Sequence, residues 1–416
     1  MTETDREDYQ LYVGIDWAST AHRVVSLNAA RTVVADQEVA HTGAALAALA
    51  DELIARAGGR AAAVAVAIEV PRGPVVETLL ERGCAVYVLN PKQLDRFRDR
   101  YSVAGAKDDR RDAQVLAMAL ITDRAALRRL RVEEPTVIRL RELGRSEAEL
   151  QQELTRLTNR LREQLLRYYP QALGRCPAAD EPWFWELLTL APTPAAAARL
   201  PLARVRALLR AHRIRRVTAE AVLAELQTAA LRVAPGTAEA ASENIGWLLP
   251  RLELLARQRQ DCARRVQQVL DELTTSEPRS EPRDVLILRS VPGIGRVIAA
   301  TLLGEAASEV ALRDYHALRT HGGLAPVTKQ SGKRRDVQMR YACHARLRDA
   351  FYHWGRVSAQ RDARSRTHYR QLRQRGHSHA RALRGVVDRL LAMLMAMLRT
   401  QTCYDPGRRQ PLAQRA

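Results

Sequence analysis

The stretch that most constrains the fold is an apolar, strand-forming run near the start of the chain, Leu11–Ile15, which ends in the acid Asp16. Two further runs, His22–Ala29 and Thr32–Val39, follow it closely. They are typical of strands, so the three runs together predict an antiparallel meander. Burying a lone carboxylate at the end of the first strand costs free energy. Asp16 therefore either caps a turn or lies in a site with a partner.

Two more apolar runs of strand length follow, and they alternate with helical segments. Ala61–Ile68 is apolar throughout and ends in Glu69, and Ala85–Leu89 comes after a predicted helix. A strand that is apolar on both faces is typical of a central strand covered on both sides. The pattern predicts a mixed α/β sheet with helices on both faces. If the strands that end in Asp16 and Glu69 are parallel neighbours, the two acids leave the sheet at the same edge.

A second acidic group opens a helix predicted to start at Asp108. The loop before it, Ser102–Lys107, is rich in small residues and predicts a mobile segment. Asp109 and Asp112 are three residues apart and share one helical face. Acids in a first turn often only complement the helix dipole. Together with the two strand-end acids, however, they have the composition of a magnesium site, because hard cations prefer oxygen ligands.

The charge balance indicates a phosphate-rich partner. The 416 residues are enough for two or three domains. There are 66 Lys and Arg against 47 Asp and Glu, which gives a net charge of +19. Neutralising a nucleic-acid phosphate releases condensed counterions and so favours binding. An Arg-rich composition bias is the alternative source of the excess, although a bias alone does not require a large net charge.

Cysteine use and the N-terminus indicate a reducing cytosol. The five cysteines are odd in number and none forms a CxxC pair, which argues against disulfides and a thiolate zinc site. The start of the chain, MTETDREDYQ, is acidic and has no apolar core, so we expect no signal peptide. The most apolar stretch, Val386–Leu398, contains Asp388 and Arg389 and is too short to span a bilayer. The cysteines are Cys84, Cys176, Cys262, Cys343 and Cys403.

The middle of the chain, about residues 129–280, has helical periodicity with two heptad seams. The sequence leaves open whether the two helices pair within the chain or between chains. A Pro- and Ala-rich insertion, about residues 170–242, separates them and contains the cationic piece Arg204–Arg216, which either contacts phosphate or is solvated. The seam residues are Leu143, Leu150, Leu154, Leu157 and Leu161, then Leu252, Leu255, Cys262, Val266, Val269 and Leu273.

The C-terminal part begins with a predicted helix-hairpin-helix over Leu286–Glu305. Its turn, VPGIG, contains Gly293 and Gly295, which permit a tight bend. Backbone N–H groups of such a turn, with the following helix N-terminus, can hold a nucleic-acid phosphate. A purely structural hairpin is the alternative.

Ser331 lies in a short polar turn surrounded by basic residues. Lys329, Lys333, Arg334 and Arg335 flank it, a composition that suits contact with nucleic acid. From the residues alone, we expect Ser331 to be an ordinary turn residue. No GxSxG motif or His partner at a diagnostic spacing accompanies it in the sequence.

Several of these segments together resemble a known family, the DEDD insertion-sequence transposases. These are recombinases with a RuvC-like domain that work with a bridge RNA. The resembling segments are GIDWAS, IEVPRG and NPKQLDRFRDRYSVAGAKDDRRDA in the first part of the chain. In the C-terminal part, the pattern GLAP…SG…LR resembles the family's transposase domain.

The resemblance assigns roles to particular residues. It implies an RNase H-like N-terminal domain whose metal ligands match Asp16, Glu69, Asp109 and Asp112, with Mg²⁺ as the cofactor and Mn²⁺ as an alternative. Asp108 adjoins the third ligand, so the choice between these two neighbours stays open. It also implies that the Ser of the SG step, here Ser331, attacks DNA. Relatives usually carry a Ser-Lys-x-Gly-like step where this chain has Arg340-Tyr341-Ala342-Cys343.

The fold class expected is α/β plus α. It comprises a RuvC-like catalytic domain over residues 1–128, a helical and coiled-coil region over 129–280, a mainly helical transposase domain over 281–400 and a disordered tail over 401–416. The resemblance implies donor and target DNA as substrates, a bridge RNA that selects them by base pairing, and a homo-oligomer, dimer or tetramer, with composite sites. We expect a cytoplasmic, nucleoid-associated bacterial protein.

The function expected is therefore transposition through a covalent link between Ser331 and DNA. One alternative is a metal-dependent junction nuclease that uses the same acids and activates water, leaving Ser331 idle. A second alternative is a nucleic-acid-binding scaffold without chemistry. Clustered carboxylates argue against the scaffold, because binding phosphate does not call for them.

Overall fold

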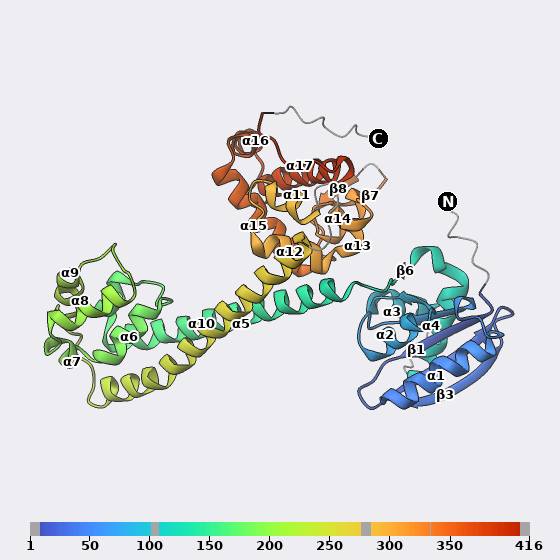
Figure 1. The fold of residues 1–416 in the computed structure, drawn as a ribbon, viewed down its shortest axis with the longest axis horizontal. Helices are drawn as coiled ribbons and strands as arrows, with labels where there is room; N and C mark the ends of the chain where they lie inside the picture. Colours follow the sequence, from blue (N-terminus) through green and yellow to red (C-terminus); the bar gives the residue numbers. More distant parts are fainter. Residues whose placement is uncertain (1–8, 101–107, 276–283, 333, 408–416) are drawn as a thin grey trace. The chain divides into compact units, whose positions relative to one another are not determined.

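The computed structural model describes residues 9–100, 108–275, 284–332 and 334–407 (Figure 1). The predicted mobile loop, Ser102–Lys107, lies outside the described residues, as does Lys333. The chain divides into two compact units, Met1–Glu134 and Pro135–Ala416. The predicted middle region, apart from its first six residues, and the predicted C-terminal region both fall within the second unit.

The first unit is built on a six-stranded mixed sheet with the order β3-β2-β1-β4-β5-β6. The first three strands form the predicted antiparallel meander, while β4 pairs in parallel with β1, and β5 with β4. The strands are β1 (Leu11–Asp16), β2 (Ala21–Asn28), β3 (Val33–Ala40), β4 (Val64–Ile68), β5 (Ala85–Val88) and β6 (Arg128–Arg129). The predicted mixed sheet is therefore confirmed.

Helices cover both faces of this sheet, as predicted. Residues of α1 (Gly43–Arg56) and α2 (Pro74–Glu81) pack with Val13 and Ile15 of β1 on one face. On the other face, α3 (Pro91–Asp99) and α4 (Asp109–Asp123) pack against the alternate residues of β4 and β5. Short 3₁₀ turns are η2 (Ala61–Ala63) and η3 (Arg124–Ala126).

Two local expectations need correction. The predicted strand Ala61–Ile68 begins only at Val64, because its first three residues form η2 and alanine favours strands weakly. The basic segment after β5 was not predicted to be helical, yet it forms α3. Its start carries clear signals: Pro91 at the first helical position and a capping box between Asn90 and Gln93.

The contact between β1 and α4 is unusually close, and Gly14 makes it possible. A Cβ atom on Gly14 would lie well inside van der Waals distance of the Ala113 carbonyl oxygen and 2.7 Å from the Ala117 nitrogen. Both are backbone atoms of α4, which a side-chain rotation cannot move. The absence of a side chain at Gly14 therefore sets how near the first turns of α4 approach the sheet.

We predict that Gly14→Ala lowers the free energy of unfolding by about 1–3 kcal/mol or more, since the added methyl group displaces a helix backbone. Urea unfolding followed by circular dichroism measures this change. Gly43→Ala is the matched control, because nothing lies within 4 Å of a Cβ there. Equal stability of the two variants would show that α4 does not rest on β1 as described.

The second unit contains a long helical hairpin. Helices α5 (Pro135–Tyr168) and α10 (Thr237–Thr275) pack antiparallel within the chain, because the first turns of α5 meet the last turns of α10: Leu140 packs with Val266 and Leu270. The two predicted heptad helices thus pair intramolecularly. Between them lie η4 (Pro170–Arg175), α6 (Pro182–Leu190), α7 (Pro194–Ala198), α8 (Leu202–Ala211) and α9 (Ala219–Leu226). These form a small helical cluster with its own core at one end of the hairpin (Figure 1).

The rest of the second unit is a helical bundle with one two-stranded hairpin. Its core gathers around the last helix, whose residues Val386 to Leu398 are largely buried. The elements are α11 (Asp284–Ser290), α12 (Arg296–Glu305), α13 (Ala307–Ala311), α14 (Tyr315–His321), β7 (Val327–Ser331), β8 (Arg334–Gln338), α15 (Ala345–Arg361), α16 (Ala363–Gln374) and α17 (His379–Thr400).

Three smaller observations bear on the predictions. All five cysteines are free thiols. Within the described residues, no helix combines the length and the apolar character that crossing a membrane requires. In the predicted tail, the Tyr404 N–H donates to Ser290 Oγ at 2.8 Å, so the chain is held against the bundle at this residue. Residues 408–416 lie outside the described residues.

Candidate active site

The sheet brings two of the predicted acids to one edge. In the parallel pair β1 and β4, Ile15 lies opposite Ile68, so Asp16 and Glu69 follow side by side at the same ends of neighbouring strands. Alternation along β1 puts Asp16 on the face of Gly14, which is the face that α4 covers. The parallel-neighbour condition stated for the sequence is thus met.

Helix α4 brings the other two acids to the same region. Its first turn contains Asp109 and Asp112, and Ala113, the next residue, contacts Gly14 two positions before Asp16. Asp108 is the N-cap residue, and its carboxylate accepts a hydrogen bond of 2.9 Å from the Arg111 N–H. Because capping already uses Asp108, the geometry favours Asp109 as the acid available for a ligand role.

The carboxylates are neighbours in topology but do not converge on one point. Among the residues that the structure describes, no three of these four acids bring ligand oxygens within 4.8 Å of one another. Asp112 is 2% exposed, and its Oδ1 lies 3.0 Å from Nε of Arg98 on α3. The donor set nevertheless fits a hard divalent cation, since it offers carboxylate oxygens only.

Sequence reasoning missed the arginines that surround these acids. Arg23 lies opposite Asp16 in the β1–β2 pair, and Arg110 follows Asp109. Both guanidinium groups reach Asp36 of β3, each with a nitrogen 2.5 Å from one of its carboxylate oxygens. Asp36 therefore joins β2, β3 and the start of α4. In the sequence, Asp36 is one polar residue of an alternating strand, and such a residue usually only faces solvent.

A histidine pair supports the turn that follows Asp16. The Ala18 N–H donates to Nδ1 of the fully buried His22 (3.3 Å), so this nitrogen must carry a lone pair. The Nε2–H of His22 then donates to Nδ1 of His41 at 2.8 Å. Burial, reinforced by the neighbouring His41, lowers the pKa of His22 from its ordinary value. The exposed Trp17 packs beside both rings.

This pair predicts a pH effect with a definite sign. Because the pKa of His22 is lower in the folded protein than its ordinary 6.5, the unfolded chain binds the proton first. Above about pH 6.5, the contribution of His22 to the free energy of unfolding is thus unchanged, and it falls as the pH drops below that value. We expect hydrogen-exchange protection of residues 16–22 to fall between about pH 7.5 and about pH 5.5. His22→Gln should abolish this loss, whereas His353→Gln, at an exposed position, should keep it.

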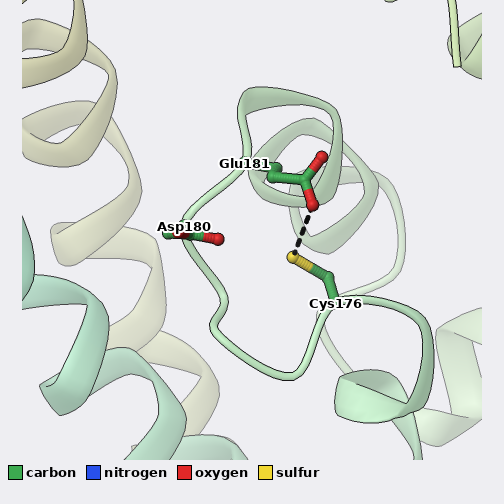
Figure 2. Close-up of side chains that lie close together, drawn as sticks. All are labelled: Cys176, Asp180 and Glu181. Atoms are coloured by element: carbon green, nitrogen blue, oxygen red, sulfur yellow. Dashed lines mark hydrogen bonds between the residues drawn. The ribbon is translucent and has the colours of Figure 1, made fainter. Parts of the chain in front are cut away.

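A separate cluster in the second unit has the residue types of a metal site, but its thiol is not in the form that binds a metal. Figure 2 shows Cys176, Asp180 and Glu181, the one group of at least three potential ligands within 4.8 Å that the described residues contain. Glu181 accepts hydrogen bonds from Trp183 on one oxygen and from Arg216 and the Cys176 thiol on the other. Burial raises the pKa of Cys176 to about 11, so the thiolate that binds metals is disfavoured. The cluster therefore links the end of η4 to α6 and to Arg216 through hydrogen bonds to Glu181.

The predicted helix-hairpin-helix is formed by α11, the VPGIG turn and α12. Gly293 has φ +87°, and a Cβ there would collide with Ser358 Oγ and lie 3.0 Å from Trp354. Trp354 Nε1 and Ser358 Oγ both donate to the Pro292 carbonyl, at 3.0 and 2.8 Å. Gly293 thus has a packing role. At Gly295, the N-cap of α12, nothing lies within 4 Å of a Cβ.

The two glycines can therefore be separated experimentally. We predict that Gly293→Ala lowers the melting temperature by several degrees, because its Cβ has no room and its backbone is left-handed. Gly295→Ala should leave the melting temperature unchanged. If the turn holds phosphate, Gly295→Ala should still weaken binding to labelled duplex DNA, measured by fluorescence anisotropy. A Gly295→Ala variant with unchanged affinity would mean that the turn is purely structural.

The start of α12 is also fixed to the long hairpin by charge. Arg296 makes two contacts of 2.6 Å with the carboxylate of Glu147 on α5. At the other end of α12, the largely buried Glu305 accepts two hydrogen bonds of 2.8 Å from Arg145, also on α5. Although burial opposes it, the Arg145 guanidinium lowers the pKa of Glu305. The Arg296 guanidinium is thus held in an ion pair with Glu147.

Ser331 is the last residue of β7, immediately before the turn that the sequence predicted for it. The side chain is exposed, and Gly332 follows with φ +55°. In the β7–β8 register, Ser331 lies opposite Arg334, and Lys329 lies opposite Asp336. Alternation places Lys329, Ser331 and Arg334 on one face of the hairpin. Arg335 lies on the other face, so it does not share the surface of Ser331.

The two histidines nearest in sequence are both engaged elsewhere. His321 Nδ1 lies 2.8 Å from Glu309 Oε1. His344 Nδ1 accepts from the Leu347 N–H, and its Nε2 is 3.6 Å from Glu305. Both rings thus act as caps or ion-pair partners within the bundle. The hairpin presents the Ser331 hydroxyl without either imidazole as its base.

Comparison with known proteins matches both halves of this arrangement. A family profile described as a transposase, of the DEDD type of IS110, matches residues 13–170. A second, described as the transposase IS116/IS110/IS902 family, matches residues 285–370. The Mini-circle putative transposase for IS117 of Streptomyces coelicolor is 31% identical over 415 residues, 98% of each chain. The chain belongs to this transposase family.

Two further relatives agree. The Putative transposase y4uE of Sinorhizobium fredii is 45% identical over 209 residues, which cover 50% of this chain and 58% of that relative. The Insertion element IS110 uncharacterized 43.6 kDa protein of Streptomyces coelicolor is 28% identical over 96% of this chain and 97% of its own length. The family resemblance expected from the sequence is confirmed, and the chain is a transposase, an enzyme that cuts and rejoins DNA.

The two matched ranges separate the candidate residues of the transposase into the same two groups. The first profile contains the four acids at the sheet edge, and the second contains the helix-hairpin-helix and Ser331. The part between them, residues 171–284, holds α6 to α9 and the whole of α10. Neither profile covers the cluster of Figure 2.

Proposed function

We propose that this transposase moves an insertion sequence by metal-dependent phosphoryl transfer through a covalent bond between Ser331 and DNA. One observation carries the proposal. The parallel register of β1 and β4 delivers Asp16 and Glu69 to the face on which α4 begins with Asp109 and Asp112. A scaffold that only binds phosphate has no use for four carboxylates at one edge of a sheet in a chain of net charge +19.

The acids would hold Mg²⁺, with Mn²⁺ as the alternative. A divalent cation bound to carboxylates supplies positive charge to a phosphate under attack and to the oxygen that leaves. The protein's own contribution is to fix the ligands: the β1–β4 pairing orients Asp16 and Glu69, and the close contact at Gly14 positions the first turn of α4. The cap at Asp108 leaves Asp109 for the ligand role.

Ser331 would be the nucleophile. Its Oγ forms a bond to phosphorus while the bond from phosphorus to the 3′ oxygen breaks, so DNA becomes linked to the protein through its 5′ phosphate. The hydroxyl proton leaves to solvent, and the released 3′ oxygen takes up a proton. When a 3′ hydroxyl of another strand attacks this phosphodiester, Ser331 is regenerated. Because the bond energy is conserved in the covalent link, rejoining needs no nucleotide cofactor.

The partners proposed are donor DNA, target DNA and a bridge RNA that pairs with both. Lys329 and Arg334 share the exposed face of Ser331, where they suit contact with phosphates next to the scissile bond. Sequence choice would then come from RNA–DNA pairing rather than from side chains. We also propose that the active form is a homo-oligomer, a dimer or a tetramer.

The test is to trap the reaction with the element's flanking DNA, its candidate RNA and Mg²⁺, and to look for labelled DNA linked to protein on a denaturing gel. The wild type should give an adduct, and Ser331→Ala should give none while still binding DNA. Asp112→Asn should lose both cleavage and adduct, again with binding retained. Thr328→Ala is the matched control, because Thr328 is exposed on the opposite face of the same strand.

Each result has a clear reading. Cleavage without an adduct, unchanged in Ser331→Ala, would mean that water is the nucleophile and that the protein acts as a junction nuclease. Cleavage of wild-type strength by Asp112→Asn would overturn the assignment of the acids. Products that do not depend on the RNA would remove the guide from the proposal while leaving the serine chemistry intact.

A further inference from the structure

The buried acid of the candidate metal site already has a positive partner within the protein. The Asp112 side chain is 3% exposed, and a carboxylate at such a position is strongly destabilised unless positive charge compensates it. Arg98 lies 3.0 Å away through Nε, with its own side chain 24% exposed. It comes from α3, the helix that packs beside the start of α4 on the same face of the sheet.

The contact is one of charge rather than of a well-directed hydrogen bond. Arg98 Nε is close enough to Asp112 Oδ1, but its N–H is not aligned to donate to that oxygen. A misaligned ion pair gains mainly from Coulomb attraction, which any cation at that place can supply. A divalent ion on the same carboxylate would supply more of it and would repel the guanidinium.

Arg98 also has a second partner to which it can move. Its Nη2 lies 2.9 Å from Asp95 Oδ1, one helical turn earlier on α3. Asp95 is 63% exposed and therefore solvated. Leaving Asp112 for Asp95 thus carries Arg98 from a buried carboxylate to an exposed one without stranding its charge.

We propose that Arg98 is the resident counter-ion of the metal site. It neutralises Asp112 before a divalent cation binds, and it moves to Asp95 when the cation arrives. The inference rests on the proposed metal site at Asp16, Glu69, Asp109 and Asp112. It adds a positioning residue, one that holds the Asp112 carboxylate in place in the metal-free protein and sets how strongly the metal must compete for it.

Metal affinity distinguishes this role from simple packing. Arg98→Gln removes the competing charge at similar length, so Mn²⁺ should bind about tenfold more tightly or better, by removal of one unit charge near the ion. Arg98→Lys keeps the charge and should stay near the wild type. Asp95→Asn removes the alternative partner, holds Arg98 on Asp112 and should weaken Mn²⁺ binding. Free Mn²⁺ is counted by electron paramagnetic resonance with the full chain and no nucleic acid.

Stability gives a second readout that does not depend on catalysis. Arg98→Gln should melt below the wild type without metal, because Asp112 loses its compensating charge, and Mn²⁺ should raise its melting temperature more than that of the wild type. Arg100→Gln is the matched control. It removes the same charge two residues away, from an exposed pair with Asp123, and should change neither Mn²⁺ affinity nor the Mn²⁺-induced shift.

The failure of the inference and that of the metal site are distinguishable. If the wild type binds Mn²⁺ and Asp112→Asn weakens that binding, the site stands; unchanged or weaker Mn²⁺ binding in Arg98→Gln would then overturn the counter-ion role alone. If wild type and Asp112→Asn bind Mn²⁺ equally, the proposed metal site itself fails and the role of Arg98 fails with it. Equal effects of Arg98→Gln and Arg100→Gln would also overturn the inference, since net charge would then be the cause.

Discussion

The close approach of α4 to β1 at Gly14 is the contact on which the candidate site depends. Only a residue without a side chain allows the backbone of Ala113 to lie against the strand. Because Asp112 precedes Ala113, and Asp16 follows Gly14 by two residues, this one contact sets the separation between acids that are almost a hundred residues apart in the chain. The β1–β4 pairing does the same for Asp16 and Glu69. Backbone packing, rather than contacts between the acids, therefore assembles the set.

Once assembled, the four acids concentrate negative charge at one edge of the sheet, and arginines lie close to them. Four carboxylates at one edge repel one another, and Asp112 is buried as well. Arg98 compensates Asp112 directly, while Asp36 draws Arg23 and Arg110 to the neighbouring strands. If these acids hold a metal as proposed, Arg98 would let the site fold before the metal binds, because it supplies positive charge beside Asp112. Under the same proposal, Arg98 would compete with the metal for Asp112, so stability and metal affinity would be linked.

The second unit uses buried and half-buried ion pairs for a different purpose. Glu305 and Glu147 hold the two ends of α12 to α5 through Arg145 and Arg296. The helix-hairpin-helix is thereby joined firmly to the long antiparallel hairpin, while the β7–β8 strands that carry Ser331 remain exposed. An exposed hairpin on a firmly joined bundle is accessible to a large duplex, as the proposed role of Ser331 requires.

The sequence by itself determined five of the six strands of the sheet, all but the two-residue edge strand β6, together with the four acids and the serine as candidates, and the family. Strand runs with acids at their ends and glycine-bearing motifs are local patterns, so they can be recognised from the amino-acid sequence alone. Even the missed helix α3 had its signals in Asn90, Pro91 and Gln93. Only the tertiary structure decided that the heptad helices pair within the chain, that Arg98 faces Asp112 and that Asp36 joins two arginines. Such long-range contacts between charges depend on which elements pack together, and no periodicity in the chain encodes them.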